Sequence, residues 1–478
     1  MAEPLRVLLL FASLPTYFPE RHGVFDAARR GVAEIAGEHG AEFVVFREVV
    51  LNQAGAEIAL AYARERSVDF VLVLHGGFTM GDVAHTLAAS EFRLGFWAVP
   101  EPVFSGDIQL NNFVSLNMSL SIAAGRRDLT AHPAAWYFGA PESDDFRQRF
   151  GTTLDALRIL RETGSRRVGL VGGVAPTFYN MQVDRKRLAR TWNTEVVDIE
   201  MAALRAAAGK VRESAVDTAV EEMRAAGSAR VPEADMRLSA RYAQALVDLA
   251  HEHDLHGLAV SDWPDLQADP GFHPGAAFSW VEERTDIAVA SEGDVMGALS
   301  HLAARAASGK GGCLVDLCAP DPQSGALLAW HGGGGPLHLA DGGGVSWIAH
   351  PMLGRGDGQS TRPGTIADYR FAPGPVTLAR IGRDGTSVFA LEAQVVEGPS
   401  EGFLGARGWL EDFRVNAEPL ALQDVIETVL HHGIEHHFVL MTGHHGSAFA
   451  ELATWTGAKL QGALRAQPFL SPAEPLKR

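Results

Sequence analysis

The chain has 478 residues, enough for roughly three domains of ordinary size, and with 46% apolar and 21% charged residues it has the composition of a globular protein. Its formal net charge of −17 argues against nucleic acid and against an anionic membrane surface as partners. Its two cysteines, Cys313 and Cys318, are too few for a disulfide framework and form a poor zinc motif, so a reducing, cytoplasmic compartment is expected.

The first third of the chain alternates predicted strands with predicted helices. Residues 6–11 are expected to be a buried strand rather than part of a signal peptide, because Glu3 precedes them and the apolar stretch is short. Further apolar strands are expected at 41–46, 69–77 and 93–100. Short buried strands between amphipathic helices predict a parallel sheet covered on both faces. No apolar run reaches membrane-spanning length, so no membrane partner is expected.

A second α/β unit is predicted to begin with the strand at 166–173, after a helix that Gly164 ends. Helices are expected around 215–226 and 239–253, followed by the strand HGLAVSD, the helix GALSHLAARAAS and the strand CLVDLCA. Two glycine-rich stretches, VGLVGGVAP and HGGGGP, fit neither the dinucleotide fingerprint nor a Walker loop. The sequence therefore predicts no nucleotide cofactor.

From about Ala319 onward, glycine, proline and β-forming residues dominate, and short strands alternate with GP and DG turns. This pattern indicates an antiparallel sheet or barrel. We therefore predict an α/β protein with two Rossmann-like parallel-sheet domains, residues 1–165 and 166–310. A strand-rich, antiparallel barrel-like C-terminal domain, residues 311–478, follows them.

Two acidic residues lie where catalytic groups are expected. Glu292 stands where the strand DIAVA gives way to a helix, at the carboxyl end of a strand, where open α/β sheets bind ligands. Helix capping, by Glu292 or equally by Asp294, is the simpler interpretation of this stretch. Asp316 interrupts an apolar strand near its end, where an unpaired buried charge is costly. It is therefore expected either to form a turn or to be paired with a cation.

Histidines are the other candidates, since imidazole is the commonest side-chain metal ligand. His331 follows a strand and precedes a glycine run that allows a ligand to approach the backbone, although a single histidine is more often merely hydrogen-bonded. His436 and His437 enter an apolar strand, in which adjacent residues point to opposite faces. Only one of the two should therefore aim directly into a given site, unless the strand is irregular. The neighbouring histidines are expected to be incidental: His431, His432, His444 and His445.

Four stretches, in this order, resemble the L-fucose isomerase / L-arabinose isomerase superfamily: SEGDVMGAL, CLVDLCAPD, LLAWHGGGGP and GIEHHFVLMTG. The resemblance spans most of the chain. It implies a divalent metal ion, Mn²⁺, held by Glu292, Asp316 and His437 in the C-terminal half, with His331 as a fourth ligand. It also implies a sugar substrate and a homo-oligomer, either a hexamer or a trimer. The fucose-type substrate residues of the N-terminal segment are not matched, which leaves the sugar open.

The resemblance predicts a metal-dependent aldose–ketose isomerase that acts on an open-chain sugar through a cis-enediol intermediate. A divalent ion acts as a Lewis acid on the substrate oxygens, and two carboxylates with imidazoles suit Mn²⁺, with Co²⁺ or Mg²⁺ as alternatives. Glu292 and Asp316 are then also the acid/base pair, and His436 holds a substrate hydroxyl. Trp263 and Trp330 are candidates for an apolar wall against the sugar, with core packing as the alternative.

Two other classes of protein fit parts of the same pattern. Tandem α/β domains also occur in non-enzymatic sugar-binding or regulatory proteins, and fold does not dictate function. Another metal-dependent sugar enzyme, such as an epimerase or a hydrolase, could use the same ligands. A metal-binding assay distinguishes a non-enzymatic sugar-binding protein from the isomerase. Analysis of the reaction product distinguishes an epimerase or a hydrolase from it.

Overall fold

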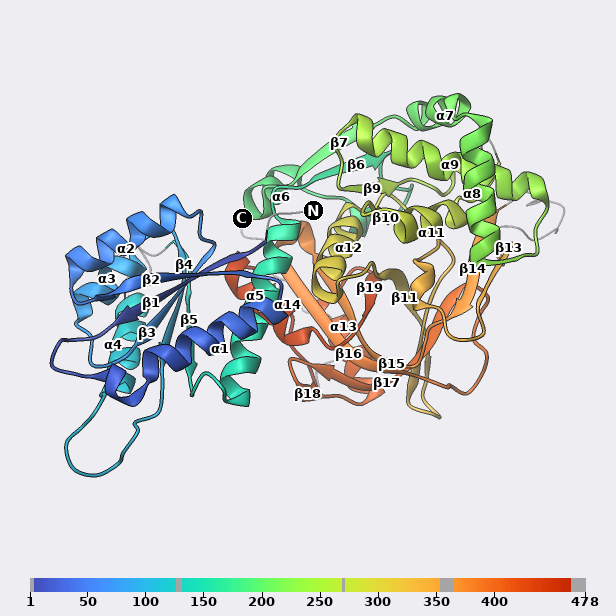
Figure 1. The fold of residues 1–478 in the computed structure, drawn as a ribbon. Coiled ribbons are helices and arrows are strands. Elements are labelled where there is room, and N and C mark those ends of the chain that lie inside the picture. Colours follow the sequence, from blue (N-terminus) through green and yellow to red (C-terminus); the bar gives the residue numbers. More distant parts are fainter. Residues whose placement is uncertain (1–3, 126–130, 269–270, 353–363, 466–478) are drawn as a thin grey trace, which may run out of the picture. The chain divides into compact units, whose positions relative to one another are not determined.

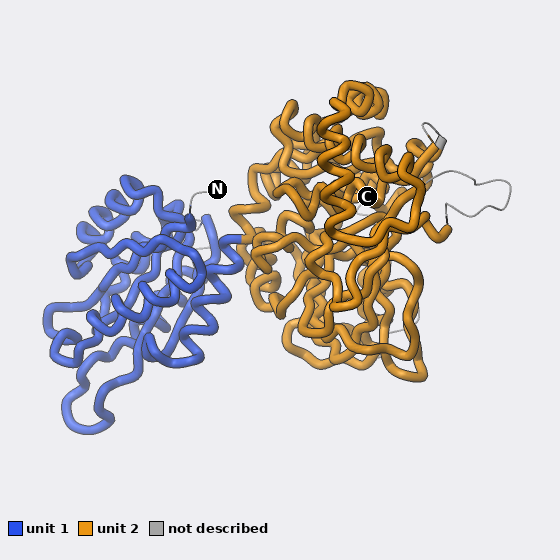
Figure 2. The backbone as a smooth tube through the Cα atoms, turned by 45° about the vertical axis from the view of Figure 1, so that its right-hand side comes forward, with its two compact units in different colours: residues 1–158 blue, residues 159–478 orange. Residues whose placement is uncertain are grey.

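The computed structural model describes residues 4–125, 131–268, 271–352 and 364–465. The chain divides into two compact units, residues 1–158 and 159–478, which are drawn in separate colours in Figure 2. Among the described residues, no helix combines the length and apolar character needed to cross a membrane.

In the described part of unit 1, five strands form a parallel sheet in the order β2-β1-β3-β4-β5. This is the order of flavodoxin-like doubly wound sheets. The strands are β1 (Arg6–Ala12), β2 (Glu42–Val50), β3 (Phe70–His75), β4 (Arg93–Ala98) and β5 (Ala134–Phe138). The helices are α1 (Val24–Glu38), α2 (Gln53–Glu65), α3 (Gly81–Ala88), α4 (Asn112–Gly125) and α5 (Asp144–Thr163), with a 3₁₀ turn at Pro19–His22. The central strands are almost wholly buried, as a sheet covered on both faces requires (Figure 1).

Unit 2 begins with a second parallel sheet, whose described strands have the order β10-β9-β6-β7. Its strands are β6 (Arg167–Val171), β7 (Glu195–Ile199), β9 (Gly257–Val260) and β10 (Ala288–Ala290). The helices around it are α6 (Arg185–Trp192), α7 (Met201–Lys210), α8 (Glu213–Ala226), α9 (Glu233–Glu252), α10 (Asp265–Ala268), α11 (Gly275–Arg284) and α12 (Val295–Ser308), with a 3₁₀ turn at Tyr179–Met181. The two parallel sheets confirm the predicted α/β part of the fold.

The C-terminal part of unit 2 contains a closed, mainly antiparallel barrel. Among the described residues, six strands pair in a circuit, β16-β15-β19-β11-β12-β17, which closes because β17 also pairs with β16. The strands are β11 (Cys313–Asp321), β12 (Ala326–His331), β15 (Gly374–Gly382), β16 (Ser387–Val396), β17 (Ala406–Val415) and β19 (His437–Thr442). The predicted strand-rich, barrel-like region is therefore confirmed.

Shorter strands and two helices extend this sheet beyond the closed circuit. They are β13 (Val345–Ala349), β14 (Thr365–Arg370), β18 (Glu418–Pro419), β20 (Lys459–Leu460), α13 (Leu422–His432) and α14 (Gly446–Thr456), with 3₁₀ turns at Leu337–Leu339 and Arg383–Gly385. One further strand, β8 (Gly227–Ala229), comes from the middle of the chain and pairs in parallel with β13. The C-terminal sheet thus draws a strand from the predicted second domain.

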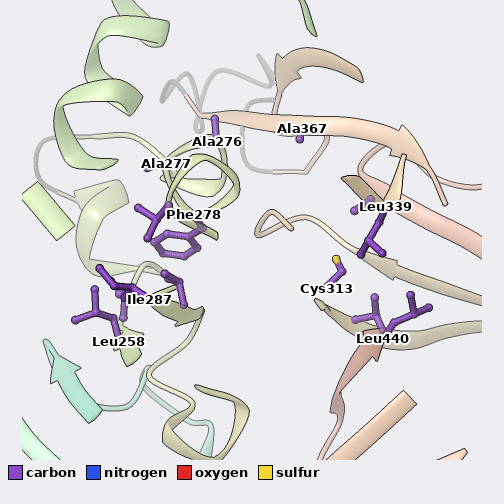
Figure 3. Packing of buried hydrophobic residues seen from close by; sticks show 14 of the residues in the cluster. Leu258, Ala276, Ala277, Phe278, Ile287, Cys313, Leu339, Ala367 and Leu440 are labelled. Carbon is purple, nitrogen blue, oxygen red and sulfur yellow. The ribbon is translucent and has the colours of Figure 1, made fainter. Parts of the chain in front are cut away.

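One buried apolar cluster joins the second parallel sheet to the barrel. It includes Leu258 of β9 and Phe278 of α11 on one side, and Cys313 of β11 and Leu440 of β19 on the other (Figure 3). Because close-packed interiors transmit small shifts, elements on either side of this cluster hold one another in place. The core is continuous across residue 310, so residues of α11 and β10 pack in the same cluster as residues of β11.

Candidate active site

The turn between β10 and α12 places Glu292. This residue has a left-handed backbone (φ 61°), which is uncommon for a residue with a Cβ. Its backbone N–H donates to Asp262 Oδ1 (2.6 Å), and its carbonyl accepts from the N–H of Ala175 (3.0 Å). A Cβ on the following Gly293 would lie 2.3 Å from the carbonyl oxygen of Gly173, so only glycine fits there. Backbone contacts from two neighbouring loops therefore fix this turn.

Asp294, and not Glu292, caps helix α12. Its Oδ1 accepts a hydrogen bond from the N–H of Gly297 (2.8 Å), the ordinary N-cap arrangement. The capping alternative for this stretch therefore belongs to Asp294. The Glu292 carboxylate is left to face a pair of histidines instead.

His436 and His437 both approach the Glu292 carboxylate. Their Nε2 atoms lie 3.4 Å and 3.5 Å, respectively, from the same oxygen, Glu292 Oε2. One potential ligand atom from each of the three residues lies within 4.8 Å of the other two. Strand β19 begins only at His437, so the alternation of a regular strand does not apply to His436. This irregular entry to the strand lets both side chains reach one point.

The contacts of His437 determine which of its ring nitrogens is available. Its Nδ1 lies 3.1 Å from Asp294 Oδ2, and an ionised carboxylate only accepts hydrogen bonds, so Nδ1 carries the proton. In the neutral ring, Nε2 then offers its lone pair toward Glu292. Burial lowers the pKa of His437, but the hydrogen bond to Asp294 and nearby carboxylate charges outweigh burial and raise it. A carboxylate behind a histidine is the usual support for a metal ligand.

His436 has a different partner. Its Nδ1 lies 3.1 Å from the amide Nδ2 of Asn180. With the amide in this orientation, Asn180 donates to Nδ1, and Nε2 of the neutral ring carries the proton and is a hydrogen-bond donor. A flipped amide would accept from Nδ1 and free Nε2 as a ligand. The pair therefore differs chemically: the neutral ring of His437 is restricted to the tautomer with a free Nε2 lone pair, whereas neutral His436 can adopt either tautomer.

Asp316 lies on the same face of the barrel as His437. Strand register places it opposite His437 on β19 and opposite Trp330 on β12, and directly opposed residues share a face. Among the described residues, its buried Oδ1 has no hydrogen-bond partner. Burial raises the pKa of the Asp316 carboxyl, although the nearby histidines counteract that shift. A buried oxygen without a partner costs roughly 1–3 kcal/mol, a penalty that a bound cation would remove. Asp316 lies outside the group of three within 4.8 Å.

His331 ends strand β12 and is buried beside His437, with ring centroids 5.3 Å apart. Its Nδ1 accepts a hydrogen bond from the N–H of Gly333 (2.7 Å), so the neutral ring carries its proton on Nε2. Burial holds the pKa of His331 well below its ordinary value, which keeps the ring neutral. In this arrangement His331 is a donor, and the predicted ligand role would require the ring to break its bond to Gly333.

Glu292, Asp316 and His331 line one cavity of about 350 Å³, whereas His436 and His437 are not among its lining residues and meet it through Glu292. Its walls include Trp263 and Trp330, both predicted from the sequence, together with Phe178, which packs edge-on against Trp263 at 6.1 Å. The remaining lining residues are Asp262, His273, Ser291, Glu292, Asp316, His331, Gly332, Gly333, His350 and Met352. The cavity thus combines an acidic side with an aromatic wall and neutral imidazole donors.

A larger cavity, of about 500 Å³, lies elsewhere in unit 2. Two of its acidic lining residues are already paired, because Arg370 contacts both Asp341 (3.0 Å) and Glu401 (3.2 Å). Among the described residues, its lining contains no group of three histidine, cysteine or acidic side chains close enough together to hold a metal ion. Size alone therefore does not identify the site, and the chemistry favours the smaller cavity.

Sequence analysis missed several residues that support the site. Asp262 follows β9 at the carboxyl end of a strand, a position that could have been recognised, and its Oδ2 pairs with His273 Nε2 (3.1 Å). Asn180 lies in a 3₁₀ turn, and Arg380 lies within an apolar strand. Neither His273 nor Arg380 belongs to a motif, so only the folded chain reveals their contacts.

No family model matches the chain. Its curated relatives are sulfoquinovose isomerases. It is 24% identical to the protein of that name from Alkalicoccus urumqiensis over 311 residues, which cover 63% of this chain and 67% of the relative. Identity to the Priestia megaterium protein is 24% over 353 residues (73% and 74%), and to the Clostridium sp. protein 25% over 374 residues (75% and 79%). These similarities cover most of the chain at low identity.

Proposed function

We propose that the protein is a metal-dependent aldose–ketose isomerase that acts on an open-chain sugar through a cis-enediol intermediate. The observation that carries this proposal is the convergence of Glu292, His436 and His437 on one point, together with the cavity that Glu292 and Asp316 both line. The names of the relatives support the same reaction class. The order of the four sequence motifs agrees with it.

The donor set fits a divalent ion of intermediate hardness. Glu292, Asp316 and His437 would hold it, since His437 has an Nε2 lone pair and Asp316 a buried oxygen without a partner among the described residues. Two carboxylates and an imidazole suit Mn²⁺, with Co²⁺ or Mg²⁺ as alternatives. When bound, such an ion supplies Lewis-acid stabilisation of negative charge on the sugar oxygens. His331 becomes a fourth ligand only in its other tautomer.

The chain's own residues perform the proton transfers. One carboxylate of the Glu292–Asp316 pair removes the proton from C2 of the aldose while O1 gains a proton, which yields the enediol. The hydroxyl at O2 then gives up its proton and C1 gains one, which gives the ketose. His436 Nε2–H and His331 Nε2–H donate hydrogen bonds to substrate hydroxyls. Trp263 and Trp330 form the apolar wall beside the sugar carbons. No atom is lost or gained overall, in keeping with an isomerisation.

For the substrate, we propose sulfoquinovose or a related aldose, following the names of the relatives. Among the described residues that line the cavity there is no lysine or arginine to face a sulfonate. Neutral sugars, including pentoses and 6-deoxyhexoses, therefore belong in the same test as the sulfonated one.

We also propose a cytoplasmic homo-oligomer, a hexamer or a trimer, from the family resemblance. Exposed apolar side chains in unit 1 support an association surface: Phe104 is 90% exposed, Ile108 61% and Phe113 55%. Both cysteines are free, in keeping with a reducing compartment.

Substrate conversion provides the direct test of the proposed function. After chelation and dialysis, the protein is expected to convert no sugar, and Mn²⁺ should restore conversion of at least one aldose in a panel that includes sulfoquinovose. In D₂O, NMR of the ketose product should show deuterium at C1. Deuterium at C2 of an epimeric aldose would instead indicate an epimerase. Sugar binding without turnover under any metal would favour a binding protein.

Metal affinity is expected to rise as the pH rises through and above 6.5, the ordinary pKa of histidine. The pKa of His437 is raised above its ordinary value of 6.5 and burial raises that of Asp316, so below these pKa values both groups hold protons that the ion must displace. Above them the ligands are already free and the affinity levels off. Titration calorimetry with Mn²⁺ in two buffers of different ionisation enthalpy should detect the released protons. An affinity that is flat across these pH values contradicts the assignment.

A further inference from the structure

An ion pair is fully buried behind the candidate active site. Arg380 on β15 donates two hydrogen bonds to Asp294 at the start of α12, from Nη1 to Oδ2 (2.5 Å) and from Nη2 to Oδ1 (3.0 Å). The two side chains are 1% and 0% exposed, and neither lines the cavity. Removing both charges from water is expensive, and an apolar pair of similar size is often at least as stable. A contribution to the stability of the fold therefore does not by itself explain why Arg380 and Asp294 are present.

The Asp294 carboxylate connects three elements of the fold. Its Oδ1 accepts from Gly297 of α12 as well as from Arg380 of β15. Its Oδ2 accepts from Arg380 and from His437 Nδ1 on β19 (3.1 Å). Capping α12 requires only an asparagine or a serine, which serve as well as aspartate. The contacts with Arg380 and with His437 both require acceptor atoms without hydrogens, and the contact with His437 also fixes which of its ring nitrogens carries the proton.

We propose that Arg380 and Asp294 are positioning residues that hold His437 with its proton on Nδ1 and its Nε2 lone pair toward Glu292. The ion pair thereby sets the metal affinity of the cavity from behind it, without touching metal or substrate. This inference rests on the proposed metal-dependent function. An amide at position 294 can turn its N–H toward His437, which then carries its proton on Nε2 and no longer offers a lone pair to the cavity.

The double variant Asp294→Asn/Arg380→Met tests the proposal. Asparagine retains the helix cap, and methionine removes a buried charge that would otherwise keep only the longer contact with Glu435, 3.9 Å from Arg380 Nε. We expect a folded protein, by circular dichroism and melting temperature, whose Mn²⁺ dissociation constant from titration calorimetry is raised about 10- to 100-fold. The single variant Arg380→Lys keeps a positive charge beside an intact Asp294. Its affinity for Mn²⁺ should therefore stay close to that of the unaltered protein.

The chain offers a matched control in the Glu282–His301 pair. Its Oε1–Nδ1 distance is 3.0 Å, both side chains are 3% exposed, and His301 lies on the same helix α12 without lining the cavity. Glu282→Gln should change stability and leave Mn²⁺ affinity unaltered. A folded double variant with normal affinity would overturn the positioning role and leave the proposed function intact. An unaltered protein that binds neither Mn²⁺, Co²⁺ nor Mg²⁺ would overturn both.

A measurement on the unaltered protein does not depend on any variant. Two-dimensional ¹⁵N–¹H NMR of the metal-free protein at alkaline pH, where the ring is neutral, reports which His437 nitrogen carries the proton. The proposal expects the Nδ1–H tautomer. Observation of the Nε2–H tautomer contradicts it, whatever the fate of the double variant.

Discussion

Glu292→Gln is expected to abolish turnover while the protein remains folded. The side chain keeps its size and can still accept a hydrogen bond, but it loses the negative charge that faces His436 and His437 and cannot accept the C2 proton. General acid/base catalysis contributes about 10² to 10⁴ in rate, and the loss of a charged ligand adds to this, so kcat should fall by at least about 10³-fold. Steady-state assays with Mn²⁺ in excess, with circular dichroism of the same sample, provide the measurement.

Glu283→Gln is the matched control for this change. Glu283 is also a partly exposed glutamate paired with a histidine, at 3.3 Å from His338, but it does not line the cavity. Its variant should retain normal kcat. A Glu292→Gln protein that is both metal-loaded and active would refute the assignment of Glu292.

His437→Gln is expected to weaken Mn²⁺ binding about 100-fold or more, because it removes the nitrogen whose lone pair the Asp294 contact directs toward Glu292. His436→Gln should weaken metal binding by less than about 10-fold and mainly raise KM, since its Nε2 is a donor in the orientation set by Asn180. Calorimetric titration of both variants with Mn²⁺, alongside steady-state kinetics, separates the two roles.

His444→Gln serves as the control for both histidine changes. It follows the same strand, but its Nε2 contacts the carbonyl of Ala393 at 3.3 Å and not the cavity. If His436→Gln is instead the variant that loses metal affinity, His436 is the ligand and His437 is not. Equal affinities in all three variants would remove this pair of histidines from the metal centre.

The pattern of apolar residues along the sequence predicted those helices and strands whose burial is regular. The continuous apolar runs of β1, β3 and β4 are readable because a parallel sheet buries both faces of its strands. The edge strand β5 was not predicted although AAWYF is also an apolar run, and Trp136 and Phe138 in it are exposed, so an apolar run does not by itself mark a strand buried on both faces. Strand β8 has the sequence GSA and exists only because it pairs with β13 across more than a hundred residues. Local propensity carries no information about that pairing.

The sequence predicted the acidic and histidine residues of the candidate site, but not the residues that orient them. Glu292, Asp316 and His437 lie in recognisable motifs, and the structure brings all three to one cavity or its border. The irregular start of β19, which admits His436 beside His437, depends on where the pairing of that strand begins. The protonation of each ring depends on Asp294, Asn180 and Gly333, whose positions relative to the histidines are set by tertiary contacts. The spacing of residues along the sequence does not predict these tertiary contacts.

Closure of the barrel through β16 and β17 has a consequence for how the protein could acquire new substrates. No strand in that ring has a free edge, so β11 and β19 cannot slip past one another without opening the whole circuit. Asp316 and His437 therefore stay opposite each other whatever happens in the surrounding loops. If the proposed function holds, segments that carry the aromatic wall, such as the turn around Phe178, can be exchanged to suit sugars of other shapes while Asp316 and His437 keep their spacing.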